Sequence, residues 1–368
     1  MKRLVFLSPL PWHSFAQRPH KFVDWVHSRT GASVLWVDPY PTRLPRWSDL
    51  KAAAPCAQTS PSSGTPPWLT LIKPGGLPIE PLPCSGWVNR FCWRHALSRI
   101  DQFTHASPAL LVVGKPSVLA HLLLQRLRHC ASLYDAMDDF PAFYTGLSRS
   151  ALARRERLIA QHVDVIWTSS SVLDAQWRRY RNEVCLVLNG LDLAAISAVK
   201  RAPMSSSRKV FGYVGTLATW FDWAWVAALA EARPNDEIRL MGPIFGAAPA
   251  HLPSNVVVLP ADNHGAALAA MAEFDVGLIP FKKTLLTASV DPIKYYEYRG
   301  LALPVISTDF GEMHGRSGLP GVFISHSHSD IAGLAEAALE CERNADEARA
   351  FARQHSWEAR FDAATLHP

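Results

Sequence analysis

Two charged side chains have a type and spacing that suit phosphate and ribose chemistry. Asp291 and Pro292 are typical of a helix start and place Lys294 in its first turn. A lysine is unfavourable there, because unpaired N–H groups and the macrodipole already make a helix start positive. A bound phosphate would remove the conflict. Glu297 lies one turn further along the same face and could accept hydrogen bonds from a ribose diol. The pair therefore indicates a nucleotide site, and the alternative is a solvated (i, i+3) ion pair.

A second acidic cluster follows an apolar strand predicted at residues 132–136. Asp138 and Asp139 come directly after it, and ligands usually bind at the carboxyl ends of parallel strands. Either carboxylate could act as a general base that removes a proton from a hydroxyl group. The alternatives are that Asp139 caps the next helix and that Asp138 is solvated. Asp135, inside the strand, is expected to make a structural hydrogen bond or ion pair.

The loop after the first predicted strand contains further polar side chains. His13 is an alternative base, because imidazole titrates near neutrality. The Arg18 guanidinium suits a phosphate, either on an acceptor or on a diphosphate. A packing explanation is equally open, in which Trp12 and Phe15 cover the sheet.

Short apolar runs alternate with helical patterns along the chain, which predicts α/β architecture. A chain of 368 residues is longer than a single hydrophobic core usually supports, and its length fits two domains. In the first half, the apolar runs predict strands at residues 4–8, 33–37, 69–72, 110–113, 132–136, 165–168 and 184–188. The second half predicts strands at residues 210–214, 237–240, 255–259, 276–279, 303–306 and 321–324. Helices are expected in the second half at about residues 223–232, 264–272, 291–299 and 330–343.

The predicted fold is two Rossmann-like, doubly wound parallel-sheet domains that face a cleft. The first domain is placed at residues 1–195. A polar linker at 196–209 precedes a second domain at 210–345, and a terminal helical segment follows at 346–368.

The segment around Lys294 resembles the donor-binding segment of GT-B glycosyltransferases, which carries a Pro-x-Lys-x-x-Glu-Tyr core before a Gly-x-Pro-Val-Ile strand. The matching residues are Pro292, Lys294, Glu297, Tyr298 and Leu303-Pro304-Val305-Ile306. Many relatives have a glutamate eight residues before the ribose glutamate, and Ser289 stands there in this chain. This departure argues against the retaining subgroup that uses two such glutamates. The resemblance implies that Ser289 and Tyr298 contact the nucleotide sugar.

The resemblance implies roles for further residues. Gly215 and Thr216 match the turn that opens the nucleotide domain, and Gly242 matches a turn beside the base pocket. Both turns are also common in strand-to-loop connections of any function. Trp12 and Arg18 match an acceptor-side loop of bacterial polysaccharide glycosyltransferases. The resemblance also implies that the first domain, residues 1–195, is on the acceptor side, that the second, residues 210–345, binds the nucleotide sugar, and that the terminal helix crosses back to the first domain.

Composition limits the other classes of function. The net charge is +5 without a concentrated basic stripe, so a nucleic acid is not expected as a partner. The scattered cysteines and histidines predict no metal site, and no cofactor is expected. No apolar run reaches the length of a membrane span. The apolar run near the N-terminus is interpreted as a first core strand and not as a signal peptide. We therefore expect a cytoplasmic protein. The basic, aromatic helix at residues 87–100 would allow peripheral contact with the inner face of the membrane, or it packs on the sheet.

These observations predict a metal-independent glycosyltransferase of the hexosyltransferase type. Its donor would be a nucleoside diphosphate sugar, with UDP favoured by frequency in the class. The acceptor would be a hydroxyl of a glycan or lipid-linked molecule in bacterial polysaccharide assembly. Two alternatives remain: a nucleotide-sugar epimerase on the same scaffold, and a non-catalytic protein that binds nucleotide sugars or glycans. The sugar, the acceptor, the stereochemical outcome and the oligomeric state stay open.

Overall fold

The computed structural model describes residues 1–44, 65–200, 208–246 and 248–364. The chain divides into two compact units, unit 1 (residues 1–187 with Ala364) and unit 2 (residues 188–363). Residues 201–207 of the predicted linker and 365–368 of the predicted terminal segment lie outside the described residues.

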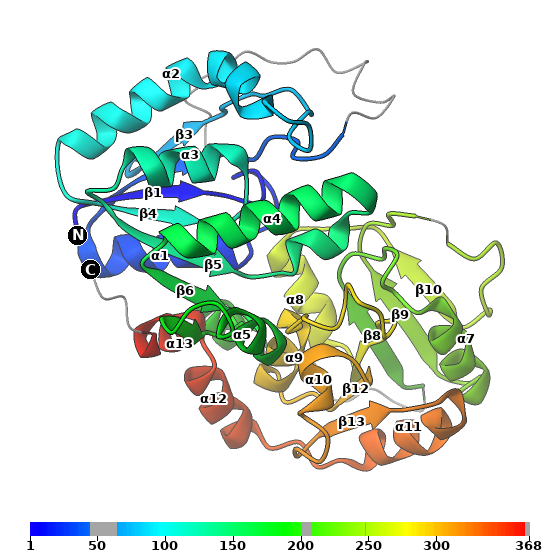
Figure 1. The fold of residues 1–368 in the computed structure, drawn as a ribbon. Coiled ribbons are helices and arrows are strands. Elements are labelled where there is room, and N and C mark those ends of the chain that lie inside the picture. Colours follow the sequence, from blue (N-terminus) through cyan, green and yellow to red (C-terminus); the bar gives the residue numbers. More distant parts are fainter. Residues whose placement is uncertain (45–64, 201–207, 247, 365–368) are drawn as a thin grey trace. The chain divides into compact units, whose positions relative to one another are not determined.

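Unit 1 is built on a seven-stranded parallel sheet with the strand order β3-β2-β1-β4-β5-β6-β7. Figure 1 shows helices on both faces of this sheet. The strands are β1 (Arg3–Leu7), β2 (Ser33–Val37), β3 (Leu69–Ile72), β4 (Ala109–Val113), β5 (Ala131–Ala136), β6 (Val165–Thr168) and β7 (Val184–Leu186). The helices are α1 (Arg18–Thr30), α2 (Ser85–His105), α3 (Val118–Arg126), α4 (Gly146–His162), α5 (Ser171–Trp177) and the short 3-10 helix η2 (Phe140–Phe143).

Unit 2 repeats this plan with a six-stranded parallel sheet in the order β10-β9-β8-β11-β12-β13. The strands are β8 (Val210–Val214), β9 (Glu237–Met241), β10 (Val256–Leu259), β11 (Val276–Ile279), β12 (Val305–Thr308) and β13 (Val322–Ser325). The helices are α6 (Leu193–Ala198), α7 (Trp223–Ala232), α8 (His264–Ala272), α9 (Ile293–Gly300), α10 (Gly311–His314), α11 (Ile331–Glu340), α12 (Ala345–Gln354), α13 (Trp357–Ala363) and the 3-10 helix η3 (His328–Asp330). The terminal helices α12 and α13 belong to unit 2, and their predicted crossing to the first domain stays a prediction.

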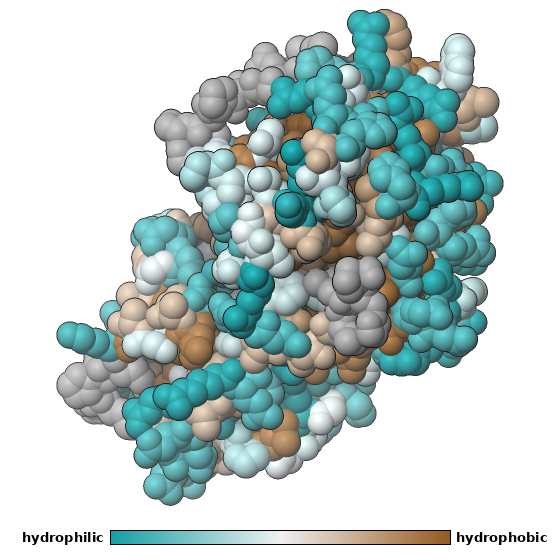
Figure 2. All heavy atoms as spheres, turned by 90° about the vertical axis from the view of Figure 1, so that its left-hand side faces the viewer, coloured by the Kyte–Doolittle hydropathy of each residue, from teal (hydrophilic) through white to brown (hydrophobic). Residues whose placement is uncertain are grey.

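Apolar cores lie on the two faces of the second sheet because successive strand residues point to opposite sides. In β8, Phe211 and Tyr213 pack with Trp225 of α7, whereas Val214 packs with α8 and α9. The polar outer faces of the covering helices complete the layers, and Figure 2 shows apolar atoms interspersed among hydrophilic ones on the surface. The predicted α/β class and doubly wound sheets are confirmed.

In both sheets the strand order reverses beside the first strand, next to β1 and β4 in unit 1 and next to β8 and β11 in unit 2. Such a reversal leaves a crevice at the carboxyl ends of the strands, where ligands bind in doubly wound folds. No helix among the described residues has the length and apolar character needed to cross a membrane.

Candidate active site

Two predicted glycines lie together at the reversal point of the second sheet. Gly215 follows β8 at φ +154°, and Gly242 follows β9 at φ +149°. A Cβ atom on Gly242 would lie 2.0 Å from the Gly215 carbonyl oxygen, so only glycine allows this approach. The Gly215 N–H donates to the Met241 carbonyl at 2.9 Å. The Gly215 amide is therefore used inside the sheet, and the predicted approach of other backbone N–H groups to a phosphate at this glycine stays a prediction.

Thr216 is the polar residue that this turn leaves available. Its carbonyl oxygen accepts a hydrogen bond from the Tyr213 hydroxyl at 3.2 Å. Its amide and its side-chain hydroxyl have no hydrogen-bond partner within the described parts of the chain. Two donors are thus available at the carboxyl edge of the sheet, which is the arrangement an anionic ligand requires.

The helix α9 begins at Ile293, two residues after the predicted start, and Lys294 is its second residue. Pro292 occupies the N-cap position and provides no side-chain cap for the first N–H groups. The Lys294 amine pairs with the Glu297 carboxylate. The side chains are only 22% and 6% exposed, so this is a mostly buried pair and not the solvated one that the alternative interpretation required.

The Asp291 carboxylate, just before α9, makes several hydrogen bonds that hold the start of this helix in place. It accepts hydrogen bonds from the Asn189 amide at 2.7 Å, the Tyr296 hydroxyl at 3.0 Å and Arg316 Nη2 at 2.5 Å. The Arg316 guanidinium also lies 3.9 Å from the centre of the Tyr295 ring. Sequence analysis missed Arg316, since nothing local marks a partner 25 residues from Asp291. This network fixes the position of the helix start.

Ser289 is buried at the position where relatives carry a glutamate. Its hydroxyl has no hydrogen-bond partner among the described residues. The segment that contains it is held close to α10, because the Glu312 amide donates to the Val290 carbonyl at 3.1 Å. A buried, unpaired hydroxyl is unfavourable unless a ligand or water satisfies it, so Ser289 remains a candidate contact.

Tyr298 does not fit the predicted ligand contact. Its side chain is fully buried, and its hydroxyl accepts a hydrogen bond from the Val214 amide at 3.2 Å. The ring fills the space above Gly277, where a Cβ atom would lie 2.5 Å from it. The prediction that Tyr298 binds the donor is therefore corrected: this residue joins α9 to β8 inside the core.

In unit 1, Asp138 is the acidic residue best suited to accept a proton. Burial raises its pKa from 3.8 to about 7, and the neighbouring Asp135 and Asp139 add to the increase. A base with a pKa near neutrality is deprotonated under ordinary conditions and still binds a proton effectively. Asp138 is half-buried, so it is neither fully solvated nor fully enclosed by the protein.

Asp139 occupies the N-cap position of η2, but its side chain makes no capping hydrogen bond. Burial raises its pKa as well. Both carboxylates thus stay candidates for the base, with Asp138 favoured by its pKa near neutrality.

Arg18 and Asp135 form a buried ion pair across unit 1. Arg18 Nε lies 3.0 Å from Asp135 Oδ2, and Nη2 lies 2.8 Å from Oδ1. Arg18 Nη1 donates to the Val187 carbonyl at 2.6 Å. The structural ion pair predicted for Asp135 is confirmed. A guanidinium that is 1% exposed cannot reach an acceptor phosphate, so the prediction for Arg18 is corrected to a positioning role.

The aromatic residues after β1 support the packing explanation for Trp12. Its ring lies 5.0 Å from the ring centre of His20 and 5.1 Å from that of Trp36. Its backbone amide donates to Asp38 Oδ1 at 3.1 Å. His13 is exposed on the same loop, whereas Phe15 is too exposed to cover the sheet. Ligand contacts of Trp12 and His13 stay predictions.

A buried tyrosine and glutamate beside the Asp138 loop were not found from the sequence. The Tyr134 hydroxyl donates to Glu156 Oε1 at 2.5 Å, and burial raises the Glu156 pKa to about 8. The side chains come from β5 and α4, and no spacing rule connects them. A neutral Glu156 keeps additional negative charge away from Asp139.

No family model matches the chain. A protein of Bacillus subtilis (strain 168) named "Putative teichuronic acid biosynthesis glycosyltransferase TuaH" is 26% identical over 199 residues. That match covers 48% of this chain and 50% of the relative, so the chain spans about half the length of the curated relative it matches.

Solved structures match over nearly the whole chain. Sucrose-phosphate synthase from Thermosynechococcus elongatus has a TM-score of 0.68 at 13% identity, with 98% of this chain and 96% of that chain covered. Anabaena HepE, solved in complex with UDP, has a TM-score of 0.65 at 12% identity, with 99% and 98% covered. An E. coli structure titled trehalose-6-phosphate, bound with UDP-2-fluoro glucose, has a TM-score of 0.62 at 12% identity, with 98% of each chain covered. With two doubly wound parallel sheets and these structural relatives, the chain has the fold of the GT-B glycosyltransferases.

Proposed function

We propose that the protein is a glycosyltransferase that uses a nucleoside diphosphate sugar, with UDP as the nucleotide. The observation that carries this proposal is Lys294, a mostly buried amine at the uncapped start of α9. The Thr216 amide and hydroxyl supply further donors from the same unit. A diphosphate would satisfy the amine, the helix start and the hydroxyl together. The titles of structural relatives that name UDP or a UDP sugar support the choice of nucleotide.

In the proposed reaction an acceptor hydroxyl attacks the anomeric carbon of the donor sugar. The new carbon–oxygen bond forms as the bond to the diphosphate breaks, and the leaving electron pair stays on the diphosphate oxygen. Asp138 receives the proton of the hydroxyl, while Lys294 stabilises the negative charge on the leaving group. Glu297 pairs with Lys294, and its carboxylate is the proposed acceptor for the ribose hydroxyls. Transfer then needs neither a metal nor another cofactor.

The acceptor proposed is a hydroxyl of a glycan or a lipid-linked saccharide in bacterial polysaccharide assembly. Support comes from the name of the Bacillus subtilis relative, which refers to teichuronic acid biosynthesis. Product analysis with saccharide acceptors would identify the acceptor, and the anomeric configuration of the product would establish the stereochemistry.

Calorimetric titration with UDP tests the donor site directly. A charge-assisted hydrogen bond is worth about 1.5–3 kcal/mol, so Lys294→Gln should weaken UDP binding roughly 10- to 100-fold. At least the same loss is expected for a double variant, Lys294→Gln with Glu297→Gln, which leaves no unpaired buried carboxylate and also removes the proposed ribose contact. The matched control is Arg353→Gln, an exposed charge on α12 of the same unit. Unchanged UDP binding in both lysine variants would refute the donor site.

A further inference from the structure

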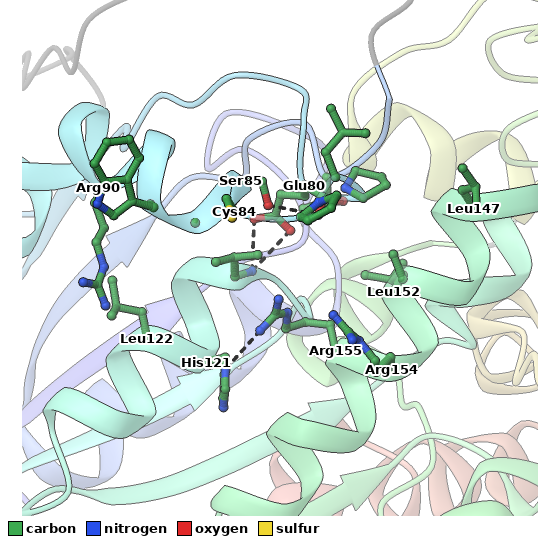
Figure 3. A pocket seen from close by; sticks show the side chains of 18 of the residues that line it. Glu80, Cys84, Ser85, Arg90, His121, Leu122, Leu147, Leu152, Arg154 and Arg155 are labelled. Atoms are coloured by element: carbon green, nitrogen blue, oxygen red, sulfur yellow. Dashed lines mark hydrogen bonds between the residues drawn. The ribbon is translucent and has the colours of Figure 1, made fainter.

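A large cavity in unit 1 is lined by three of its helices and is rich in arginine. It has a volume of about 740 Å³ and lies among α2, α3 and α4. Arg90 reaches it from α2, and Arg154 and Arg155 reach it from α4, as Figure 3 shows. None of these three guanidinium groups forms a salt bridge with a carboxylate within the described residues. We call this cavity the arginine pocket.

The one acidic residue among the described residues that line the arginine pocket does not neutralise it. Glu80 accepts hydrogen bonds from the Tyr40 hydroxyl and from the Val118 amide, the latter at 3.0 Å. Its carboxylate is buried at the base of the cavity, and burial raises its pKa. Glu80 also interacts electrostatically with Arg155, but one carboxylate beside three guanidinium groups leaves the pocket with an excess of positive charge.

Arg155 is held in place by a neutral histidine. Arg155 Nη1 donates to His121 Nδ1 at 3.0 Å, as the dashed line in Figure 3 indicates. Burial and the adjacent Arg155 lower the His121 pKa to about 4, so the imidazole stays neutral and accepts this hydrogen bond. A positioned guanidinium of this kind retains its other N–H donors for an anion.

The rim of the arginine pocket is apolar and exposed. Trp87 on α2 is 79% exposed, and Leu147 on α4 is 71% exposed. Phe91 on α2 is also exposed, with Arg94 lying 4.4 Å from its ring centre. By contrast, Trp93 of the same helix is buried in the core. The aromatic residues of α2 are thus divided between packing inside unit 1 and an outward surface.

Cations that line an open cavity, with large apolar side chains at its rim, match the boundary of an anionic bilayer, where phosphate groups lie next to acyl chains. A soluble phosphate would need the arginines but not the exposed tryptophan and leucine. We propose that the arginine pocket binds the phosphate of an anionic lipid headgroup while Trp87 and Leu147 enter the adjoining acyl region. This inference does not depend on the proposed transfer reaction, because it rests on unit 1 residues outside the donor site.

Sedimentation of the full chain with vesicles tests the proposal. One set of vesicles contains phosphatidylcholine alone, and the other contains equal parts of phosphatidylcholine and phosphatidylglycerol. We expect the protein to bind the anionic vesicles preferentially at low salt. Because each cation near the surface strengthens binding about fivefold, the triple variant Arg90→Gln, Arg154→Gln, Arg155→Gln should bind on the order of 100-fold more weakly.

Two further variants distinguish lipid binding at the arginine pocket from a general effect of the protein's net charge. The control triple Arg128→Gln, Arg157→Gln, Arg179→Gln removes the same charge from exposed positions of unit 1 that do not line the cavity. It should keep most of the affinity. The double variant Trp87→Ser, Leu147→Ser should lose roughly tenfold or more, because it removes the apolar contribution. Near-ultraviolet circular dichroism and UDP titration of every variant verify folding and an intact unit 2.

Three outcomes would overturn the proposal. The first is equal binding to neutral and anionic vesicles, and the second is an equal loss in the control triple and the pocket triple. The third is tight binding of soluble glycerol 3-phosphate, lost in the pocket triple, without vesicle binding; it would assign the arginine pocket to a soluble anion.

Discussion

Replacing Asp138 by asparagine should abolish activity and at the same time stabilise unit 1. The pKa of Asp138 is raised from 3.8 to about 7 because burial disfavours its charge. Between these values the folded chain binds the proton more tightly than the unfolded chain, so stability falls as pH rises. At about 1.4 kcal/mol per pH unit the full interval corresponds to about 4 kcal/mol. Asp138 retains some solvent contact, which makes this an upper value.

Asparagine cannot ionise, so the Asp138→Asn variant avoids this loss. Its stability advantage over the wild type should grow by about 3 kcal/mol between about pH 5 and about pH 8, and then remain constant. For a unit of this size the change corresponds to roughly 5–10 °C in Tm. Differential scanning calorimetry of both proteins across this pH range measures it. Asp346→Asn, at an exposed position of α12, is the control and should show almost no such change.

The same variant tests the catalytic role. Wild-type kcat/KM should rise with pH and level off above about pH 7, because only the carboxylate accepts a proton. Asp138→Asn should lower kcat roughly 10²- to 10⁴-fold. If Tm changed with pH in the same way for the wild type and the variant, the raised pKa of Asp138 would be refuted. If the variant were active with the pH profile of the wild type, the role of Asp138 as the general base would be refuted.

Other substitutions in unit 2 separate packing from ligand binding. Gly242→Ala should destabilise the chain by at least about 2 kcal/mol, because its Cβ atom would lie 2.0 Å from the Gly215 carbonyl; urea denaturation measures this, and a neutral effect would contradict the packing role. Tyr298→Phe leaves the Val214 amide without its acceptor and should cost about 1–3 kcal/mol in urea while UDP affinity stays unchanged, whereas lost affinity with unchanged stability would restore the predicted ligand contact. Ser289→Ala removes an unpaired buried hydroxyl, so it should leave stability unchanged or raised; calorimetry with UDP sugars should show weaker binding if that hydroxyl contacts the ligand.

The sheets could be predicted closely from the sequence because each strand is a short apolar run bounded by polar or turn residues. All the predicted strands overlap a strand of the structure, and the helices Trp223–Ala232 and His264–Ala272 match at both ends. The predicted positions of helix ends were less accurate where the sequence has no strong signal that ends a helix. The helix predicted to reach Arg343 ends at Glu340, since Cys341 adopts an extended backbone.

The candidate site was predicted only in part, because side-chain partners depend on tertiary contacts. Lys294 and Glu297 were found from local helix geometry, which operates over a few residues. The burial of Arg18 against Asp135 joins positions 117 residues apart and has no local signature. Tyr298 lies within a motif whose neighbours are predicted to face a ligand, and only the structure shows that its ring points into the core.

The Asp291 network has a consequence for local opening of the chain. Asn189 lies 102 residues before Asp291, yet its amide donates to that carboxylate at 2.7 Å. The beginning of α9 therefore cannot fray without also releasing the segment at the start of unit 2. Amide hydrogen exchange in these two segments should proceed as one cooperative event with a common opening free energy. Occupation of the helix start by UDP would then slow exchange at Asn189, a distant reporter of ligand binding that needs no label.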